Sequence, residues 1–290
     1  MIPRANITAW RADAPWADDA QVEQDLVLSR AVVELFAPSD LAGRIALRGG
    51  TSIHKLFLTP PCRYSEDIDL VQIVLGPIGP VIDAIRASLD PWLGEPRRKR
   101  GPNSVALSYR LESEVPPVRP LRLKIEINTR EHFALLGTKA VGFVVSNRWF
   151  TGNCSVATFE MDELLGTKLR ALYQRRKGRD LFDLWLCLEK GMVDPERLVD
   201  CFVQYMSRTG GVPTRAQFEQ NLAIKARDST FLSDIRPLLR PGLAYDAAKA
   251  VDVVRRTLSG REACAILKRH VFRRPVDDVF DSQQSDGLTA

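Results

Sequence analysis

Two aspartates separated by one residue, Asp67 and Asp69, have the spacing in this chain that most directly predicts chemistry. They alternate with Ile68 and Leu70, and because alternate residues of a strand lie on opposite faces, the two carboxylates share one face. Neighbouring carboxylates repel each other unless a cation lies between them, and Mg²⁺ prefers carboxylate oxygens together with substrate phosphates. The spacing therefore predicts either a Mg²⁺ site with Asp67 and Asp69 as ligands, or two solvated aspartates at a strand end.

A glycine-rich turn precedes the aspartates. It reads Gly49-Gly50-Thr51-Ser52 and follows an apolar strand predicted over residues 45–47. Glycines let backbone N–H groups approach an anion closely, and the helix predicted over residues 52–57 directs its N-terminus toward that anion. An anion-binding turn beside a metal-binding pair is the arrangement of a nucleoside triphosphate site.

The combined pattern resembles the first signature of the AbiEii/MenT-type nucleotidyltransferase toxins, within the DNA polymerase beta-like nucleotidyltransferase superfamily. The matching residues are Gly49, Gly50, Thr51, Ser52, Arg63, Ser65, Asp67 and Asp69. Such a set in register is far more specific than an isolated pair of aspartates. The resemblance implies that the two aspartates are catalytic metal ligands, and that the turn, Arg63 and Ser65 bind the nucleotide.

A helix predicted over residues 161–173 carries a lysine inside its apolar stripe. Lys168 lies three residues after Leu165 and four before Leu172. A buried ammonium lowers stability unless an anion meets it. Lys168 therefore either binds triphosphate oxygens in a cleft or extends its charged head into water.

Lys168 also begins a pattern that resembles the second signature of the same family. Gly178 ends the preceding helical segment, and Arg179, Asp180 and Asp183 follow in order at the start of the next. The resemblance implies that Lys168 and Asp180 are catalytic and that Lys168 also contacts the nucleotide. Asp183 is predicted to be structural, bonding Arg179 or a nearby backbone group.

A strictly alternating strand over residues 119–129 supplies a third acidic candidate. Arg122, Lys124, Glu126 and Asn128 share its polar face. In the nucleotidyltransferases a third carboxylate comes from a strand beside that of the aspartate pair, so Glu126 is predicted to be a third metal ligand. A structural ion pair of Glu126 with Arg122 or Lys124 is the alternative.

The element patterns predict strands followed by a helical bundle, an α+β fold, and the resemblance implies that the first part is a mixed-sheet, polymerase beta-like nucleotidyltransferase domain. The expected boundaries are residues 1–158 for the first domain, 159–272 for the helical domain and 273–290 for a loosely ordered tail. A helix is predicted over residues 18–36, irregular strands over residues 131–158, and a helix N-cap at Thr158.

Composition places the chain among ordinary globular proteins and excludes several classes. Its 290 residues have a net charge of +5, which permits a polyanionic partner without requiring one. No apolar run approaches the ~18 residues of a membrane span, and the N-terminus lacks the apolar segment of a secretory signal, so a cytoplasmic protein is expected. The five cysteines include no CxxC pair, which favours free thiols and argues against zinc.

The resemblance implies a metal-dependent transfer of nucleotides from NTP to the 3′ end of tRNA, by the toxin of a toxin–antitoxin pair whose antitoxin is of the AbiEi type. Basic runs at residues 97–100 and 175–177 suit an RNA acceptor, although the first also suits a solvated edge strand. The alternatives are modification of a protein or small-molecule hydroxyl, or a non-catalytic module that binds RNA or a partner.

Overall fold

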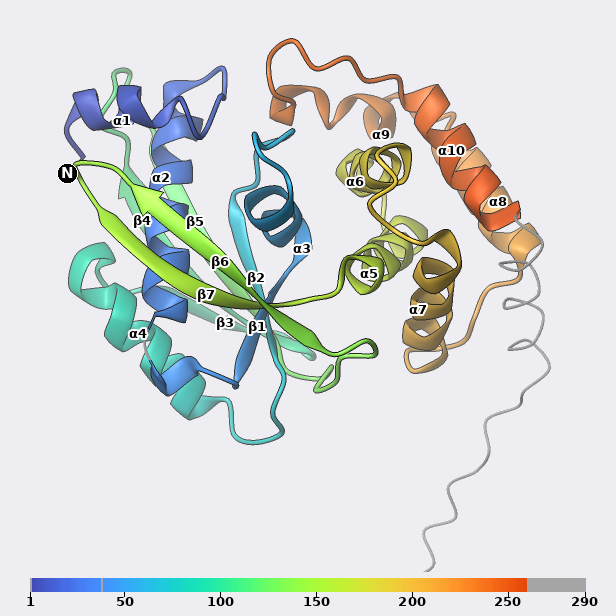
Figure 1. The fold of residues 1–290 in the computed structure, drawn as a ribbon, viewed down its shortest axis with the longest axis horizontal. Coiled ribbons are helices and arrows are strands. Elements are labelled where there is room, and N and C mark those ends of the chain that lie inside the picture. The colour runs from blue at the N-terminus through green and yellow to red at the C-terminus, as the bar shows by residue number, and fades with distance from the viewer. Residues whose placement is uncertain (1, 38, 260–290) are drawn as a thin grey trace, which may run out of the picture.

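One mixed sheet of seven strands organises the part of the chain that the computed structural model describes, residues 2–37 and 39–259 (Figure 1). The strand order is β3-β4-β5-β2-β1-β7-β6. The strands are β1 (Ile45–Arg48), β2 (Asp67–Gln72), β3 (Arg97–Arg100), β4 (Ser104–Glu112), β5 (Pro120–Asn128), β6 (Thr138–Ser146) and β7 (Thr151–Phe159). The β2–β5 and β1–β7 pairs are parallel and the other pairs are antiparallel, so the predicted mixed sheet is confirmed.

One face of the sheet is covered by α1 (Arg4–Trp10), α2 (Asp19–Phe36) and α4 (Gly79–Leu93), as Figure 1 shows. The predicted helix over residues 18–36 is α2, whose N-cap is Asp18: its carboxylate accepts from the Ala20 N–H at 2.9 Å. The short α1 was not predicted. It is fixed by a tertiary contact, in which Trp10 Nε1 donates to the buried Asp25 carboxylate at 2.8 Å.

The opposite face carries the helical part of the chain (Figure 1). Its segments are α3 (Gly49–Ser52), a π-helix (Ile53–Phe57), α5 (Met161–Gln174), α6 (Gly178–Glu189), α7 (Pro195–Ser207), α8 (Arg215–Lys225), α9 (Ser229–Ser233) and α10 (Ala247–Ser259). Short 3₁₀ segments lie at Ser39–Leu41 and Arg236–Leu238. A sheet layer followed in sequence by packed helices is the predicted α+β arrangement.

Two local predictions were wrong. The segment predicted as irregular strands is a regular antiparallel hairpin, in which β6 and β7 pair from Thr138 opposite Phe159 to Ser146 opposite Thr151. Continuous pairing holds Gly142 and Gly152 in extended conformation there, which overrides their poor strand propensity. Thr158 does not cap α5: it lies in β7, and its hydroxyl donates to the Leu47 carbonyl at 2.8 Å.

Cys187 of α6 and Cys201 of α7 are buried. The predicted continuation of the last helix to residue 272 and the tail at residues 273–290 lie outside the described residues. No helix of residues 2–37 and 39–259 is both long and apolar enough to span a bilayer.

Candidate functional site

The aspartate pair lies on β2, near the middle of the sheet. Ile68 and Leu70 are buried toward α2 and α4, while Asp67 and Asp69 face the helical layer, as the alternation predicts. On the parallel neighbour β5, Lys124 is opposite Asp67, and Glu126 is opposite Asp69. Three carboxylates and one ammonium therefore occupy a small area of one sheet face.

Asp67 is the least compensated carboxylate of this group. Its Oδ1 is buried and has no hydrogen-bond partner among the described residues. Burial, followed by the negative charge of Asp69, raises the pKa of Asp67 to about 6. An orphaned oxygen beside a second carboxylate is the donor set that a hard divalent cation such as Mg²⁺ accepts, so these residues fit the predicted ion.

Glu126 has partners of its own. Its carboxylate forms an ion pair with Lys124 and accepts from Ser104 Oγ at 3.0 Å. Burial would raise the pKa of Glu126, but the bond from Lys124 lowers it. Within the described part of the chain, no three His, Cys, Asp or Glu side chains gather as a metal cluster. The metal role of Glu126 stays a prediction. Its ion pair with Lys124 matches the alternative expected from the sequence, a structural ion pair with Arg122 or Lys124.

The glycines of the turn are the first residues of α3, and they make room for functional side chains. Gly49 has a φ of +81°, and a Cβ on it would lie 2.2 Å from Asp69 Oδ2. A Cβ on Gly50 would lie 2.1 Å from Nη2 of Arg63. The glycines are therefore needed for the close approach of Asp69 and Arg63, whatever they contribute to anion binding.

The hydroxyl groups of the turn are held by protein atoms. Thr51 Oγ1 lies 2.9 Å from Ser65 Oγ and 2.5 Å from the carbonyl oxygen of Asp67. Ser52 Oγ lies 2.7 Å from Thr158 Oγ1. Thr51 and Ser52 are buried, and these contacts fix the start of α3 against β2 and β7. A direct nucleotide contact of Thr51, Ser52 or Ser65 stays a prediction.

On the helical side, Lys168 of α5 is buried in a carboxylate network. Its ammonium lies 3.2 Å from Asp180 Oδ1 and 3.0 Å from Asp183 Oδ2, both on α6. With 6% of its surface exposed, Lys168 does not extend its head into water. Its charge is met by two carboxylates of the protein, and contact of Lys168 with triphosphate oxygens stays a prediction.

Asp183 is structural, but the predicted partner was wrong. Its carboxylate forms no ion pair with the Arg179 guanidinium. Instead, Arg63 donates to it twice, Nε to Oδ1 and Nη2 to Oδ2, each at 2.7 Å, and His54 Nε2 lies 2.9 Å from Oδ1. Burial alone would raise the pKa of Asp183, but the positive charges of Arg63 and Lys168 lower it well below its usual value. Arg63 thereby ties the loop before β2 to α6.

Asp180 has a second basic partner that was not identified from sequence. Arg175, just beyond α5, donates Nε to Asp180 Oδ2 at 2.7 Å and Nη2 to Oδ1 at 2.9 Å. The fork of the guanidinium matches the carboxylate, as in other bidentate pairs. Its position five residues before Asp180, across a helix break, gave no periodic signal that would have identified the pair.

A third contact set joins the halves of the site and was also missed. Glu131 forms ion pairs with Arg48, which ends β1, and with Arg170 of α5. The Arg170 guanidinium also lies 4.8 Å from the ring centre of Tyr205 on α7. These contacts fix α5 relative to the sheet at one end of the cleft.

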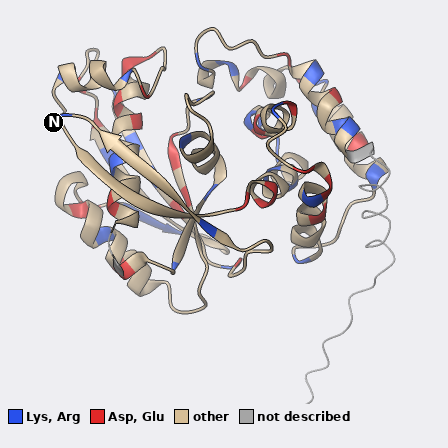
Figure 2. Ribbon diagram, in the orientation of Figure 1, with Lys and Arg blue, Asp and Glu red and all other residues tan. Residues whose placement is uncertain are grey.

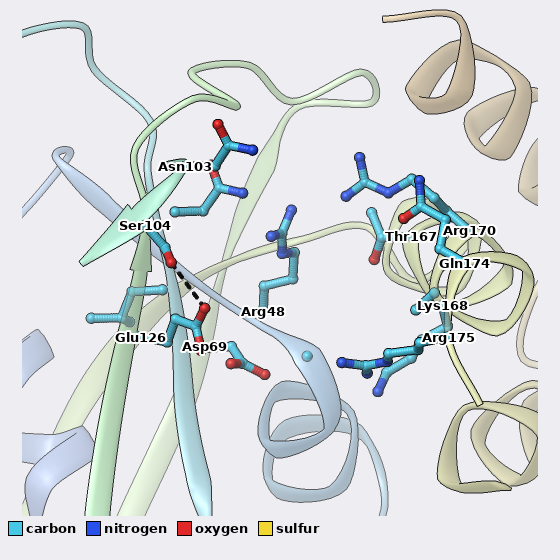
Figure 3. Close-up of a pocket in the computed structure, with 14 residues that line it drawn as sticks. Arg48, Asp69, Asn103, Ser104, Glu126, Thr167, Lys168, Arg170, Gln174 and Arg175 are labelled. Carbon is cyan, nitrogen blue, oxygen red and sulfur yellow. Dashed lines mark hydrogen bonds between the residues drawn. The ribbon is translucent and has the colours of Figure 1, made fainter. Parts of the chain in front are cut away.

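Two adjoining cavities lie between the sheet and α5. The wider, of about 320 Å³, is shown in Figure 3: Asn103, Ser104 and Glu126 line the sheet side, and Thr167, Arg170 and Gln174 line the helical side.

The smaller cavity, of about 90 Å³, is lined by Ser65, Asp67 and Arg179. Both are lined by Asp69, Glu126, Lys168 and Arg175. The two signatures, about a hundred residues apart in sequence, thus meet in one cleft.

Solved structures show the same fold. MenT4, a nucleotidyltransferase toxin from Mycobacterium tuberculosis H37Rv, superposes with a TM-score of 0.64 at 18% identity, over 92% of this chain and 90% of that chain. JHP933 from Helicobacter pylori superposes with a TM-score of 0.50 at 16% identity, over 88% of this chain and 95% of that chain.

Sequence comparison gives the family. No sequence of a curated protein matches the chain. The profile described as nucleotidyl transferase AbiEii toxin, type IV TA system, matches residues 30–254, which is most of the chain and includes both signatures. The chain therefore belongs to the AbiEii family of nucleotidyl transferase toxins of type IV toxin–antitoxin systems.

Proposed function

We propose that this toxin transfers nucleotides from an NTP to the 3′ end of tRNA in a Mg²⁺-dependent reaction, and thereby blocks translation. One observation supports the proposal most strongly: Asp67, whose Oδ1 has no partner among the described residues, and Asp69 line one cavity with Lys168 and Arg175. Carboxylates for a metal on one wall and cations for phosphates on the other are what nucleotidyl transfer requires.

Asp67 and Asp69 would hold Mg²⁺, with Glu126 as the third acidic candidate. The ion would neutralise the triphosphate and the charge that develops on the α-phosphate. The turn at Gly49 and Gly50, together with Arg63, Ser65 and Lys168, would orient the triphosphate. The acceptor hydroxyl loses its proton to water as its oxygen forms a bond to the α-phosphorus, in line with the bond that breaks. The bridging oxygen leaves with pyrophosphate.

The position of β3 supports an RNA acceptor. All four residues of β3, Arg97–Arg100, are exposed, and the strand forms the basic edge of the sheet (Figure 2). The turn from β3 to β4 reaches Asn103 and Ser104, which line the wider cavity. A backbone that follows β3 would bring its 3′ end into that cavity. Phosphate contacts of this kind weaken as salt rises.

Membership of a type IV toxin–antitoxin family implies an antitoxin. We propose a separate DNA-binding protein of the AbiEi type, acting with the toxin in the cytoplasm, where tRNA is aminoacylated.

Transfer of label to RNA tests the proposal. The protein is incubated with Mg²⁺, total RNA and each labelled NTP in turn, and Asp67→Asn serves as the inactive control. We expect a labelled tRNA-sized band with the wild type, which is lost when the RNA 3′ ends are first oxidised with periodate. Label on protein or on small molecules alone would contradict the tRNA acceptor, and no transfer from any NTP would contradict the reaction itself.

A further inference from the structure

The smaller cavity is lined by basic side chains that differ in whether they already have a partner. The five are Arg63, Lys124, Lys168, Arg175 and Arg179. Arg63 is bound by Asp183, Lys124 by Glu126, and Arg175 by Asp180. Lys168 is shared between Asp180 and Asp183. Four of these cations are therefore neutralised within the protein.

Arg179 is the exception. Among residues 2–37 and 39–259, no acceptor atom forms a hydrogen bond or ion pair with its guanidinium, although its positive charge acts to lower the pKa of Asp67 and of Asp234. The side chain is half-buried and lies against the small cavity, opposite Asp67 and Asp69. A guanidinium has five N–H donors and stays charged, so a partly desolvated one without an acceptor is unfavourable until an anion binds.

The backbone around Arg179 adds to its positive potential. Arg179 is the second residue of α6, which begins at Gly178. The N-terminus of a helix carries partial positive charge, which disfavours a cation and favours an anion. At α6 this charge is partly compensated, because the Gly178 N–H donates to the Asp234 carboxylate at 2.9 Å. The adjacent Asp180 does not compensate Arg179, because its carboxylate is bound by Arg175 and Lys168.

We propose that Arg179 binds the β- and γ-phosphates of the nucleoside triphosphate, the part that leaves as pyrophosphate; this inference deepens the proposed function and rests on it. When the bond between the α-phosphorus and the bridging oxygen breaks, its electron pair stays on the pyrophosphate oxygens. Arg179 donates hydrogen bonds to that growing charge. Arg179 thereby provides positive charge for the leaving group. Lys168 cannot provide this charge alone, because its ammonium is shared between two carboxylates.

Binding of inorganic tripolyphosphate tests the inference without nucleotidyl transfer. Calorimetry with Mg²⁺ present compares the wild type, Arg179→Gln and the matched control Arg227→Gln, which changes an exposed arginine that lines neither cavity. Losing a charge-assisted pair should weaken binding by Arg179→Gln roughly 10- to 100-fold, with less than about a threefold change in the control. Equal binding by all three proteins, or none by the wild type, overturns the inference.

Kinetics separates this inference from the proposed function. With the best NTP, Arg179→Gln should raise KM and lower kcat, since the contact strengthens as the leaving group gains charge. The unfolding temperature of Arg179→Gln should not fall below that of the wild type, because among the described residues the side chain has no hydrogen-bonded partner to lose. Wild-type kinetics in Arg179→Gln overturns the inference alone. Arg179-dependent tripolyphosphate binding by a protein that transfers no nucleotide supports the anion site and refutes the proposed reaction.

Discussion

On the sheet side of the cleft, Asp67 and Asp69 lie on one face of β2, and Asp67 Oδ1 has no partner in the described part of the chain. On the helical side, Asp180 and Asp183 are surrounded by cations. The pKa values differ accordingly. Burial and Asp69 raise the pKa of Asp67 to about 6, while the cations around Asp183 lower its pKa well below the usual value despite burial.

The difference separates two uses of buried charge. A carboxylate left without a partner costs folding free energy and remains free to bind a cation. A carboxylate enclosed by Arg63, Lys168 and His54 has no free capacity, but it fixes the positions of those side chains. The sheet side should therefore respond to mutation mainly in activity, and the helical network mainly in stability.

The largest expected effect is on activity, at Asp67. Asp67→Asn should lower nucleotide transfer roughly 10³- to 10⁵-fold, because it removes a charge that neutralises the reacting phosphates through the metal. The same change should raise the unfolding temperature, since it relieves repulsion from Asp69. Transfer assays and thermal melts check both parts, and a strongly destabilised Asp67→Asn would remove the contrast with the helical side.

Asp183→Asn should produce the largest loss of stability. Arg63 and Lys168 would be left buried near an uncharged amide, which should lower the free energy of unfolding by about 3–5 kcal/mol. Asp252→Asn is the control, because it breaks an exposed pair with Arg255 and should change stability by less than about 0.5 kcal/mol. Urea unfolding gives the free energy of unfolding of both variants. If Asp183→Asn loses as little stability as Asp252→Asn, the buried network is not what holds α6 to the loop before β2.

Acid should weaken the same network through His54. Burial and the charge of Arg63 lower the pKa of His54 from an ordinary 6.5 to about 4. Between these values the unfolded chain takes up a proton that the folded chain does not, so stability falls as pH decreases from about 6.5 to 4. The full contribution is about 3 kcal/mol.

His54→Gln should flatten this pH dependence, and His132→Gln should leave it unchanged. The free energy of unfolding at several pH values between 4 and 7 gives the comparison. Parallel curves for the wild type and His54→Gln would show that another group causes the acid lability.

The smallest expected effect tests the close approach at Gly50. Gly50→Ala places a methyl group against Arg63, so the guanidinium must shift, at about 1–3 kcal/mol of stability. Gly142→Ala meets no atom within 4 Å and is the matched control. The melting temperatures of Gly50→Ala and Gly142→Ala are compared with that of the wild type. Equal melting temperatures of the two variants would mean that Arg63 can shift without loss of stability.

Local periodicity was sufficient for much of the fold. The alternation around Asp67 and Glu126 predicted two strands and the faces their acids share, and the structure places Asp69 opposite Glu126. The irregularity predicted from Gly142 and Gly152 was wrong, because pairing between β6 and β7 outweighs the preference of single residues. The helix α1 was missed, since a bond from Trp10 to the distant Asp25 holds it.

Motifs and alternation are properties of neighbouring residues, so the family, the α+β class and the residues of both signatures can be recognised without coordinates. Which charges neutralise each other depends on contacts that form when the chain folds. Arg63 and Asp183 are 120 residues apart in sequence, and no periodicity links them. Arg179 stands beside Asp180 in sequence, yet the guanidinium that binds Asp180 is that of Arg175. Adjacent residues of a helix point in different directions. The Asp180 carboxylate therefore binds Arg175 and Lys168, and the neighbouring Arg179 guanidinium remains available for an anion.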